Sequence, residues 1–431
     1  MIDPVLPSEK NTFERYQNAV QFLEGLSNIP EERDYMRDRA QPSIYLKRMN
    51  YFLGLLGHPE KGCKYIHVTG TSGKGTVTTM LHEILYASGK RVGSFTSPFV
   101  TTTIEEIRVG DSYISPDEFA NIVEHMKPNI DHAYLRGPYG KPSYFEICLA
   151  IAFIYFRQKK CEWIVLEVGA GGCYDATNII VRPSIMAITN IDYDHTDVLG
   201  KTLRAIALNK AGIIKKGGTF FTSEQRPQLL KIFRDICELH GVPFHHIPRQ
   251  IGYRDYNRCL VTAIARTLKI HEGHIKHGIE RTRLPCRFEI MQNTPLVVID
   301  GAHNRAKIKS TLENLAQRKY RRLHLVIGIS DNKDHGAMLK QIIPLAQTIS
   351  FTRFQMKDRK CAHPKFLWEQ SKRFMQKGTV TRVLLDPMRA LSLALNEAKH
   401  DDLILITGSF FLAGELRKRW ISEEQILEKR S

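Results

Sequence analysis

The stretch YIHVTGTSGKGTVTTM, residues 65–80, decides the fold. Its first residues are mostly apolar or β-branched, which predicts a buried strand over 64–69. The glycine-rich segment 70–76 follows, and from Val77 onward apolar residues recur at helical spacing. A strand, a glycine-rich loop and a helix in this order form a cradle for phosphate, because backbone N–H groups and the helix N-terminus face the anion.

The loop differs from the common nucleotide-binding pattern. Val68 stands where the first glycine of that pattern belongs, and Gly75, rather than Ser or Thr, follows Lys74. The functional groups of such a loop are nevertheless present. Lys74 can place a positive charge on the outer phosphates, and Thr76 can offer its hydroxyl to Mg²⁺. The alternative is a glycine turn before an ordinary helix. The coincidence of strand, glycines, lysine, threonine and helix favours the phosphate cradle.

Length and composition indicate a globular protein of two domains. A chain of 431 residues is longer than a single hydrophobic core usually accommodates, which favours two domains. The composition, 42% hydrophobic and 25% charged, is typical of a globular protein. The most apolar stretch, residues 146–156, is too short to span a membrane and fits a buried helix. The N-terminus shows no secretion signal, and the eight cysteines form no Cys-x-x-Cys pair. We therefore expect a cytoplasmic protein with reduced thiols and no membrane association.

The formal net charge of +17 is spread along the whole chain. A positive field attracts nucleic acid, and it equally steers a small substrate that carries several negative charges. Charge alone favours neither class of partner.

Strand and helix patterns alternate along the chain. Strands are predicted at 64–69, 91–97, 162–167 and 184–190, with helices between them and at 202–214, which predicts a mainly parallel sheet covered on both faces. The alternation restarts near residue 288. We expect an α/β protein in which a large P-loop parallel-sheet ATPase-like domain, 1–287, precedes a smaller Rossmann-like domain, 288–431.

Ligands of parallel sheets bind at the carboxyl ends of the strands. The glycine loop, Ser97, Glu167 and the loop 190–200 all fall at such ends. Glu167 is a carboxylate at the end of an apolar strand. At such a strand end we favour a metal ligand over a structural salt bridge, because Mg²⁺ prefers hard oxygen ligands.

Other candidates are weaker from the residues alone. His195 lies among acidic loop residues and is typical of a surface histidine, and helical spacing makes Lys210 a solvated lysine. Asp175 is typical of a turn. Asp300 and His303 follow a strand of the second domain, where nucleotide or substrate contact and a helix N-cap are equally consistent with the pattern.

Taken together, these segments resemble the Mur ligase family, whose loop reads Gly-Thr-x-Gly-Lys-Gly/Thr-Ser/Thr. Within it, residues 43–415 resemble the folylpolyglutamate and dihydrofolate synthases. The matching segments, in family order, are HVTGTSGKGT, GSFTSP, YFEICLAIAF, VLEVGAGGCYDATN, ITNIDYDHTDVLG, IALNKAGIIKKG, PCRFE, DGAHN and ITGSFFLAGE.

The resemblance implies a role for each matching position. The ATP phosphates would be held by Gly70, Thr71, Ser72, Gly73, Lys74, Gly75 and Thr76. The implied magnesium ligands are Thr76, Ser97, Glu167 and His195, and the implied further nucleotide contacts are Asn257, Arg287 and Asp300. His303 would contact the glutamate side. Lys210 matches a lysine that is carbamylated in the family, and the implied catalytic residues are Lys74, Lys210 and His195.

The implied reaction is ATP-dependent addition of L-glutamate to a folate-type carboxylate through an acyl phosphate. It comprises polyglutamylation of tetrahydrofolate, conversion of dihydropteroate to dihydrofolate, or both. The implied partners are ATP, Mg²⁺, L-glutamate and a folate or pteroate, with no nucleic acid or membrane, and we expect a monomer. Another Mur-type amino acid ligase and a nucleic-acid-stimulated ATPase are the alternatives.

The chain departs from the family pattern near the expected pterin side. Phe99 replaces a histidine after Ser-Pro, Glu105 and Glu106 replace part of an Asn-Glu-Arg run, and Cys173 replaces an arginine. These departures leave the ATP-binding segments intact. They leave the identity of the acceptor open.

Overall fold

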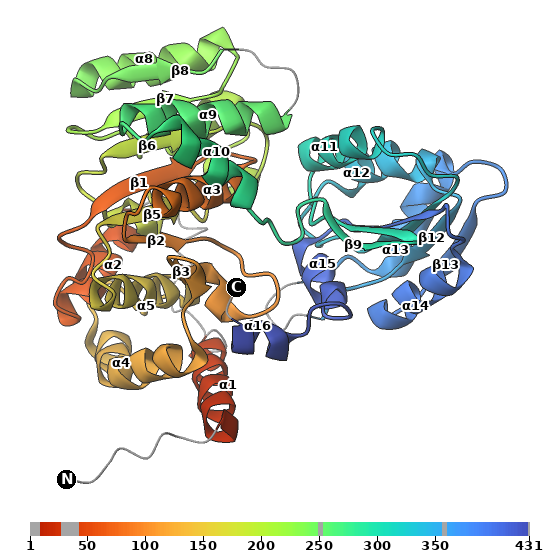
Figure 1. Ribbon diagram of the computed structural model, residues 1–431, viewed down its shortest axis with the longest axis horizontal. Coiled ribbons are helices and arrows are strands. Elements are labelled where there is room, and N and C mark those ends of the chain that lie inside the picture. Colours follow the sequence, from red (N-terminus) through yellow and green to blue (C-terminus); the bar gives the residue numbers. More distant parts are fainter. Residues whose placement is uncertain (1–8, 27–42, 249–252, 356–359, 430–431) are drawn as a thin grey trace. The chain divides into compact units, whose positions relative to one another are not determined.

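The computed structural model describes residues 9–26, 43–248, 253–355 and 360–429 (Figure 1). The chain forms two compact units. The first holds the described residues up to Phe99, those from Thr103 to Thr282, and Lys429, whereas the second holds Val100–Thr102 and the described residues of Arg283–Glu428. The predicted boundary after Arg287 therefore falls inside the second unit.

The first unit is built on an eight-stranded sheet in the order β4-β3-β2-β5-β1-β6-β7-β8. The strands are β1 (Lys64–Thr69), β2 (Val92–Phe95), β3 (Ile107–Val109), β4 (Ser112–Tyr113), β5 (Trp163–Glu167), β6 (Ile185–Ile188), β7 (Thr219–Thr222) and β8 (Phe244–His246). All neighbours pair in parallel except β2 with β3 and β3 with β4, which form an antiparallel edge. The mainly parallel sheet is confirmed.

Helices cover both faces of this sheet (Figure 1). The helices of this unit are α1 (Glu9–Leu26), α2 (Ile44–Leu55), α3 (Lys74–Ala87), α4 (Pro116–Arg136), α5 (Tyr144–Gln158), α6 (Thr196–Leu199), α7 (Leu203–Ala211), α8 (Pro227–His240), α9 (Tyr253–Thr267) and α10 (Glu272–Arg281). Ile66 and Val68 of the central strand pack with α3, α9 and α10, whereas Tyr65, on the opposite face, meets Phe153 of α5. Both faces of the strand are thus buried, as its continuous apolar sequence requires.

The second unit holds a six-stranded sheet in the order β13-β12-β11-β14-β10-β9. Its strands are β9 (Glu289–Asn293), β10 (Leu296–Ile299), β11 (Leu323–Ile327), β12 (Thr348–Phe351), β13 (Val380–Val383) and β14 (Leu403–Thr407). Its helices are α11 (Arg305–Leu315), α12 (His335–Ile342), α13 (Pro364–Ser371), α14 (Pro387–Glu397), α15 (Phe410–Arg417) and α16 (Glu423–Lys429). Only the pairing of β9 with β10 is antiparallel among these strands.

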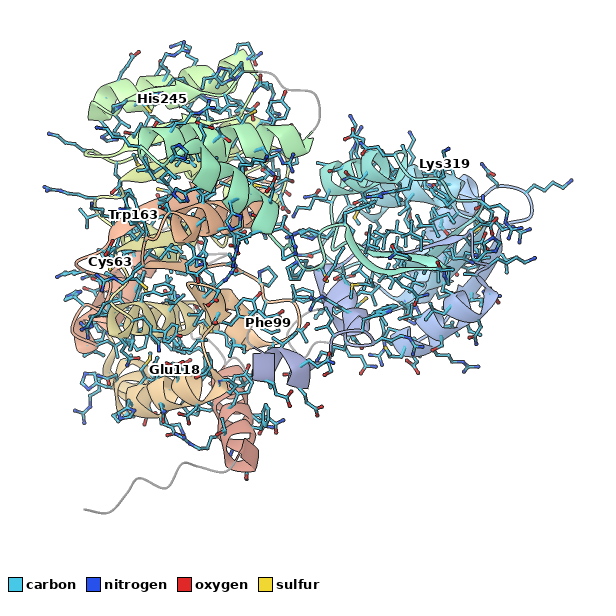
Figure 2. The ribbon with its side chains drawn as sticks, in the orientation of Figure 1. Cys63, Phe99, Glu118, Trp163, His245 and Lys319 are labelled. Carbon is cyan, nitrogen blue, oxygen red and sulfur yellow. The ribbon has the colours of Figure 1, made fainter. Side chains whose placement is uncertain are left out.

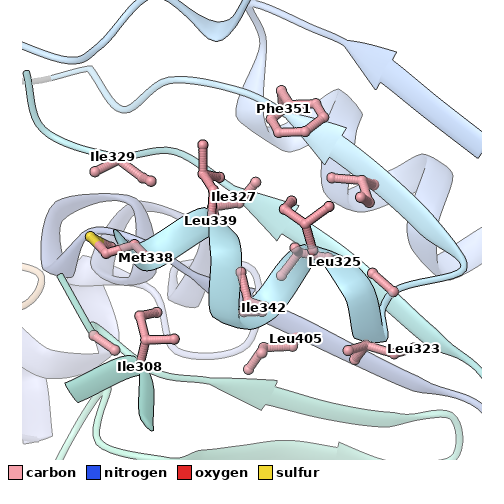
Figure 3. Packing of buried hydrophobic residues seen from close by; sticks show 14 of the residues in the cluster. Ile308, Leu323, Leu325, Ile327, Ile329, Met338, Leu339, Ile342, Phe351 and Leu405 are labelled. Carbon is pink, nitrogen blue, oxygen red and sulfur yellow. The ribbon is translucent and has the colours of Figure 1, made fainter. Parts of the chain in front are cut away.

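The core of the second unit lies on both faces of β11. Leu325 and Ile327 pack with Leu339 and other residues of α12 on one face (Figure 3). Val326 belongs to the cluster on the opposite face, which includes Leu412 of α15. The alternation of side chains along the strand places successive residues in two separate clusters.

The most apolar helix, α5, is a core element, with buried residues along most of its length. None of the described helices combines the length and apolar character needed to cross a bilayer.

Candidate active site

The phosphate loop lies at the centre of the first sheet. β1 pairs with β5 and β6 on its two sides, with Val68 opposite Glu167 and Thr69 opposite Ile188. Since these strands are parallel, the loop after Thr69, the carboxylate of Glu167 and the residues that follow β6 share one edge of the sheet. This is the arrangement that the sequence predicted.

Gly70 can be replaced by no other residue without rearrangement. Its φ is 147°, and a Cβ built on it would lie 1.8 Å from Oγ1 of Thr189. That hydroxyl donates to the carbonyl of Ser72 at 2.6 Å. The close approach of loop and strand end therefore requires glycine at this position.

The segment after β6 fixes the first half of the loop. The Thr71 N–H donates to the Asn190 carbonyl at 2.8 Å, and the Ser72 N–H donates to Asn190 Oδ1 at 2.9 Å. The Thr71 hydroxyl donates to the Asp192 carbonyl at 3.0 Å. These contacts occupy the amides of Thr71 and Ser72, so phosphate is left to the amides that follow.

Helix α3 supplies those amides. Its N-cap is Gly73, with φ 85°, and the first helical bond runs from Val77 N–H to the Gly73 carbonyl at 2.9 Å. The N–H groups of the first turn have no acceptor inside a helix, and the helix dipole adds positive potential there. The buried Ser72 hydroxyl has no hydrogen-bond partner among the described residues, and a phosphate oxygen is a suitable acceptor for it.

Glu167 lies against the start of this helix. Its side chain is buried, and Oε2 accepts a hydrogen bond from the Ser97 N–H at 3.3 Å. A Cβ built on Gly75 would lie 3.1 Å from the same oxygen. The carboxylate thus meets both Ser97 and the turn that carries Thr76, and this set of oxygen donors suits Mg²⁺.

His195 is placed less decisively. It forms the N-cap of α6 with a φ of 49°, and its N–H donates to Oδ1 of Asp194 at 3.1 Å. In the described part of the chain, no three His, Cys, Asp or Glu side chains converge as a metal site. The structure therefore does not by itself join His195 to Glu167.

Lys210 is not the solvated lysine that helical spacing predicted. Its side chain is buried, and Nζ donates to the carbonyl oxygen of Gly70 at 3.0 Å. Burial lowers the pKa of Lys210 to about 7, with a further lowering by the charge of Lys74 and opposite contributions from Asp194 and Asp175. The prediction from helical spacing was wrong because α7 directs the Lys210 side chain toward the phosphate loop rather than toward water.

Asp175 is a turn residue whose carboxylate also interacts electrostatically with Lys210 and Lys74. Its carboxylate accepts from the Ala170 N–H at 2.9 Å and from the Thr177 N–H at 3.0 Å, and it caps the short 3₁₀ helix that follows. Burial raises the pKa of Asp175, whereas its hydrogen bonds and the nearby Lys74 lower it. Only the turn was evident from the sequence.

Glu106 is a site residue that the sequence marked only as a departure from the family pattern. Its side chain is buried, and Oε1 accepts from the Phe99 N–H at 3.2 Å. Burial raises the pKa of Glu106 to about 8; the Phe99 hydrogen bond opposes the rise, and the carboxylates of Glu167 and Glu105 add to it.

The second unit holds three of the predicted residues. Asp300 directly follows β10. Burial raises the pKa of Asp300 to about 6, whereas the nearby Arg287 guanidinium and hydrogen bonds from neighbouring groups lower it. The Arg287 guanidinium lies over the Phe410 ring, 4.6 Å from its centroid. Asn257, the remaining predicted nucleotide contact, is buried on α9 in the first unit.

His303 has contacts at both ring nitrogens. Nδ1 lies 2.8 Å from the Gly301 carbonyl and Nε2 lies 2.8 Å from Nζ of Lys307. Because a carbonyl only accepts and an ammonium only donates, the arrangement assigns the proton to Nδ1 of a neutral ring.

Comparison with known proteins identifies the family of the chain. Residues 68–236 match the Mur ligase middle domain, and residues 286–410 match the Mur ligase glutamate ligase domain. The chain is 30% identical over 414 residues to the dihydrofolate synthase/folylpolyglutamate synthase of Bacillus subtilis, covering 87% of this chain and 94% of that protein. It is 29% identical over 410 residues to the folylpolyglutamate synthase of Lacticaseibacillus casei, covering 86% and 93% respectively.

Solved structures show the same fold. Folylpolyglutamate synthase of Mycobacterium tuberculosis, complexed with ADP and AMPPCP, superposes with a TM-score of 0.83 at 23% identity and covers 95% of this chain and 99% of its own. Escherichia coli FolC in complex with DHPP and ADP gives a TM-score of 0.76 at 25% identity, with coverage of 96% and 98%. The chain therefore belongs to the folylpolyglutamate synthase/dihydrofolate synthase family of Mur ligases.

Proposed function

We propose that the protein is an ATP-dependent ligase that joins L-glutamate to a folate-type carboxylate. The observation that carries the proposal is the convergence of the α3 N-terminus, Glu167 and Lys210 at one edge of the first sheet. Its relatives support the substrates, since they are named for folate glutamylation and include complexes with ADP and with DHPP.

The reaction has two steps. A carboxylate oxygen of the acceptor attacks the γ-phosphorus of ATP, ADP leaves, and an acyl phosphate forms. The glutamate amine then attacks the acyl carbon, phosphate leaves, and the amine loses a proton as the amide forms. The first-turn amides of α3 and the ammonium of Lys74 stabilise the charge on the transferred phosphoryl group.

Magnesium binding is assigned to the oxygen donors beside the loop. Thr76, Ser97 and Glu167 would hold the ion together with phosphate oxygens, and we assign His195 to the same site. When bound, Mg²⁺ supplies positive charge that offsets the charge of the phosphates.

Lys210 is proposed to act as a carbamate. A pKa of about 7 leaves a large fraction of the amine neutral at neutral pH, and only the neutral amine attacks CO₂. The ammonium first gives up one proton, the neutral amine forms the N–C bond with CO₂, and the nitrogen then releases a second proton, so the side chain changes overall from a cation to an anion. This removes the repulsion between Lys210 and Lys74 and provides two oxygens near the phosphate loop.

The remaining assignments follow the family. Arg287, Asp300 and Asn257 are proposed nucleotide contacts, and His303 is proposed to contact the glutamate side. The monomeric state and the cytoplasmic location stay predictions.

The acceptor is tested with the purified protein, ATP, Mg²⁺ and L-glutamate. The acceptors are dihydropteroate, tetrahydrofolate and a cell-wall nucleotide precursor, and the products are identified by mass. Glutamylation of either pterin compound supports the proposal. Glutamylation of the cell-wall precursor alone would favour another Mur-type ligase.

A further inference from the structure

Three residues from the first half of the chain belong to the second unit. The chain passes from Phe99 (labelled in Figure 2) into Val100–Thr102, which we call the strap, and returns to the first unit at Thr103. Thr101 and Thr102 are buried. Val100 packs against the cluster that contains Leu412 of α15. The strap is therefore seated in the core of the second unit.

Gly414 makes room for the strap. It lies within α15, and a Cβ built on it would lie 2.0 Å from the carbonyl oxygen of Val100 and 2.9 Å from its carbonyl carbon. Both are backbone atoms, so they cannot swing aside as the end of a flexible side chain can. Glycine weakens the interior of a helix relative to alanine, and the passage of the strap is the physical reason for its presence here.

The residues just before the strap belong to the candidate active site. The N–H groups of Thr96 and Phe99 donate to Glu106, to its carbonyl at 3.0 Å and to its carboxylate at 3.2 Å. The Ser97 N–H donates to Oε2 of Glu167 at 3.3 Å. Only Pro98 and Phe99 separate Ser97 from Val100, so a displacement of Val100 reaches Ser97 through three Cα–Cα steps of at most about 3.8 Å each.

We propose that the strap transmits its seating in the second unit to Ser97 and Glu167, and that Gly414 is a positioning residue for this reason. A displaced Val100 pulls on the Ser97 amide, which orients the Glu167 carboxylate beside the start of α3. The carboxylate is then correctly oriented only while the strap is seated. The consequence for catalysis rests on the proposed function, whereas the structural coupling does not.

The structural coupling is tested by Gly414→Ala, with Gly336→Ala in α12 as the matched control. The nearest atoms to a Cβ on Gly336 lie at 3.7 Å or more, so that control introduces no clash. Hydrogen exchange of the Thr96, Ser97 and Phe99 amides is measured in both variants. We expect at least a tenfold acceleration of exchange in Gly414→Ala and no change in the control. Acceleration confined to residues of α15 would overturn the proposal.

A second variant leaves α15 intact. Two glycines inserted between Phe99 and Val100 add slack to the link, and the same insertion between Lys377 and Gly378, an exposed turn, is its control. We expect a tenfold or greater loss of kcat from the first insertion, with the KM for ATP nearly unchanged, and faster exchange of the same three amides. Wild-type exchange in the first insertion would overturn the coupling. If the unmodified protein does not ligate, the proposed function is contradicted. The hydrogen-exchange result would still decide whether the strap is coupled to Ser97.

Discussion

The ammonium of Lys210 donates a 3.0 Å hydrogen bond to the carbonyl of Gly70, the first residue of the phosphate loop. This bond connects α7 to the loop across 140 positions of sequence. A buried lysine here is costly in its charged form, because burial and the neighbouring Lys74 both disfavour the ammonium. The proposed carbamylation would resolve this conflict, since it would replace the cation with an anion beside Lys74.

Lys210→Ala should therefore abolish ligation, because it removes both carbamate oxygens. Formate or acetate should restore part of the activity by occupying the vacated position. An independent readout is a carbamate signal in ¹³C NMR of the wild-type protein equilibrated with ¹³CO₂, which should be missing in the variant. Full activity of Lys210→Ala without added carboxylate would return the residue to a structural role.

Lys74→Ala should lower kcat by roughly a hundredfold or more, the usual loss when a preorganised group that stabilises transition-state charge is removed. Steady-state kinetics measure the change, and circular dichroism checks that the variant is folded. Near-normal turnover by a folded variant would contradict the assignment of Lys74 to the phosphates.

Glu167→Gln should raise the Mg²⁺ concentration needed for half-maximal activity, since an amide is a weaker ligand for a hard cation. Glu162→Gln, one residue before the start of β5, is the control. Glu162 is exposed and paired with Arg91, so its replacement should leave the Mg²⁺ dependence unchanged. Equal Mg²⁺ curves for the two variants would exclude Glu167 as a ligand.

Asp300 should make stability depend on pH. Its pKa rises from 3.8 to about 6 in the folded protein, mainly through burial. Between these values the folded state holds a proton that the unfolded chain has lost, so the free energy of unfolding falls as pH rises from about 4 to about 6. Asp300→Asn lacks this titration. The denaturant midpoint of the wild type, measured relative to that of the variant, should fall as pH rises across that range. Above pH 7 the difference between the two midpoints should be constant. A difference that is constant at every pH would contradict the raised pKa of Asp300.

The sequence predicted the parts of the fold that local chemistry determines. Helix α5 (Tyr144–Gln158) contains the apolar stretch 146–156 that was predicted to form a buried helix, and Ser143 and Glu146 form its N-terminal capping box. The phosphate loop was equally predictable, because its glycines, lysine and threonine lie within one short segment. The predicted convergence of Ser97 with Glu167 followed from their positions at the ends of parallel strands.

Features that depend on distant contacts were not predicted. The edge strands β3, β4 and β9 and the last strands β7 and β8 of the first sheet were not predicted, since short strands carry little periodic signal. Asn190 anchors the loop through one backbone and one side-chain contact, but an asparagine after a strand is also an ordinary turn residue. The burial of Lys210 and Glu106 likewise depends on segments far away in the sequence.

The most direct test of the central claim follows phosphate release by the purified protein with ATP and Mg²⁺ while L-glutamate and the pterin acceptor are omitted in turn. The account predicts that sustained release requires both, and that the acceptor gains the mass of one glutamyl residue for each phosphate released. Sustained release without acceptor or glutamate, or release stimulated by nucleic acid, would contradict it.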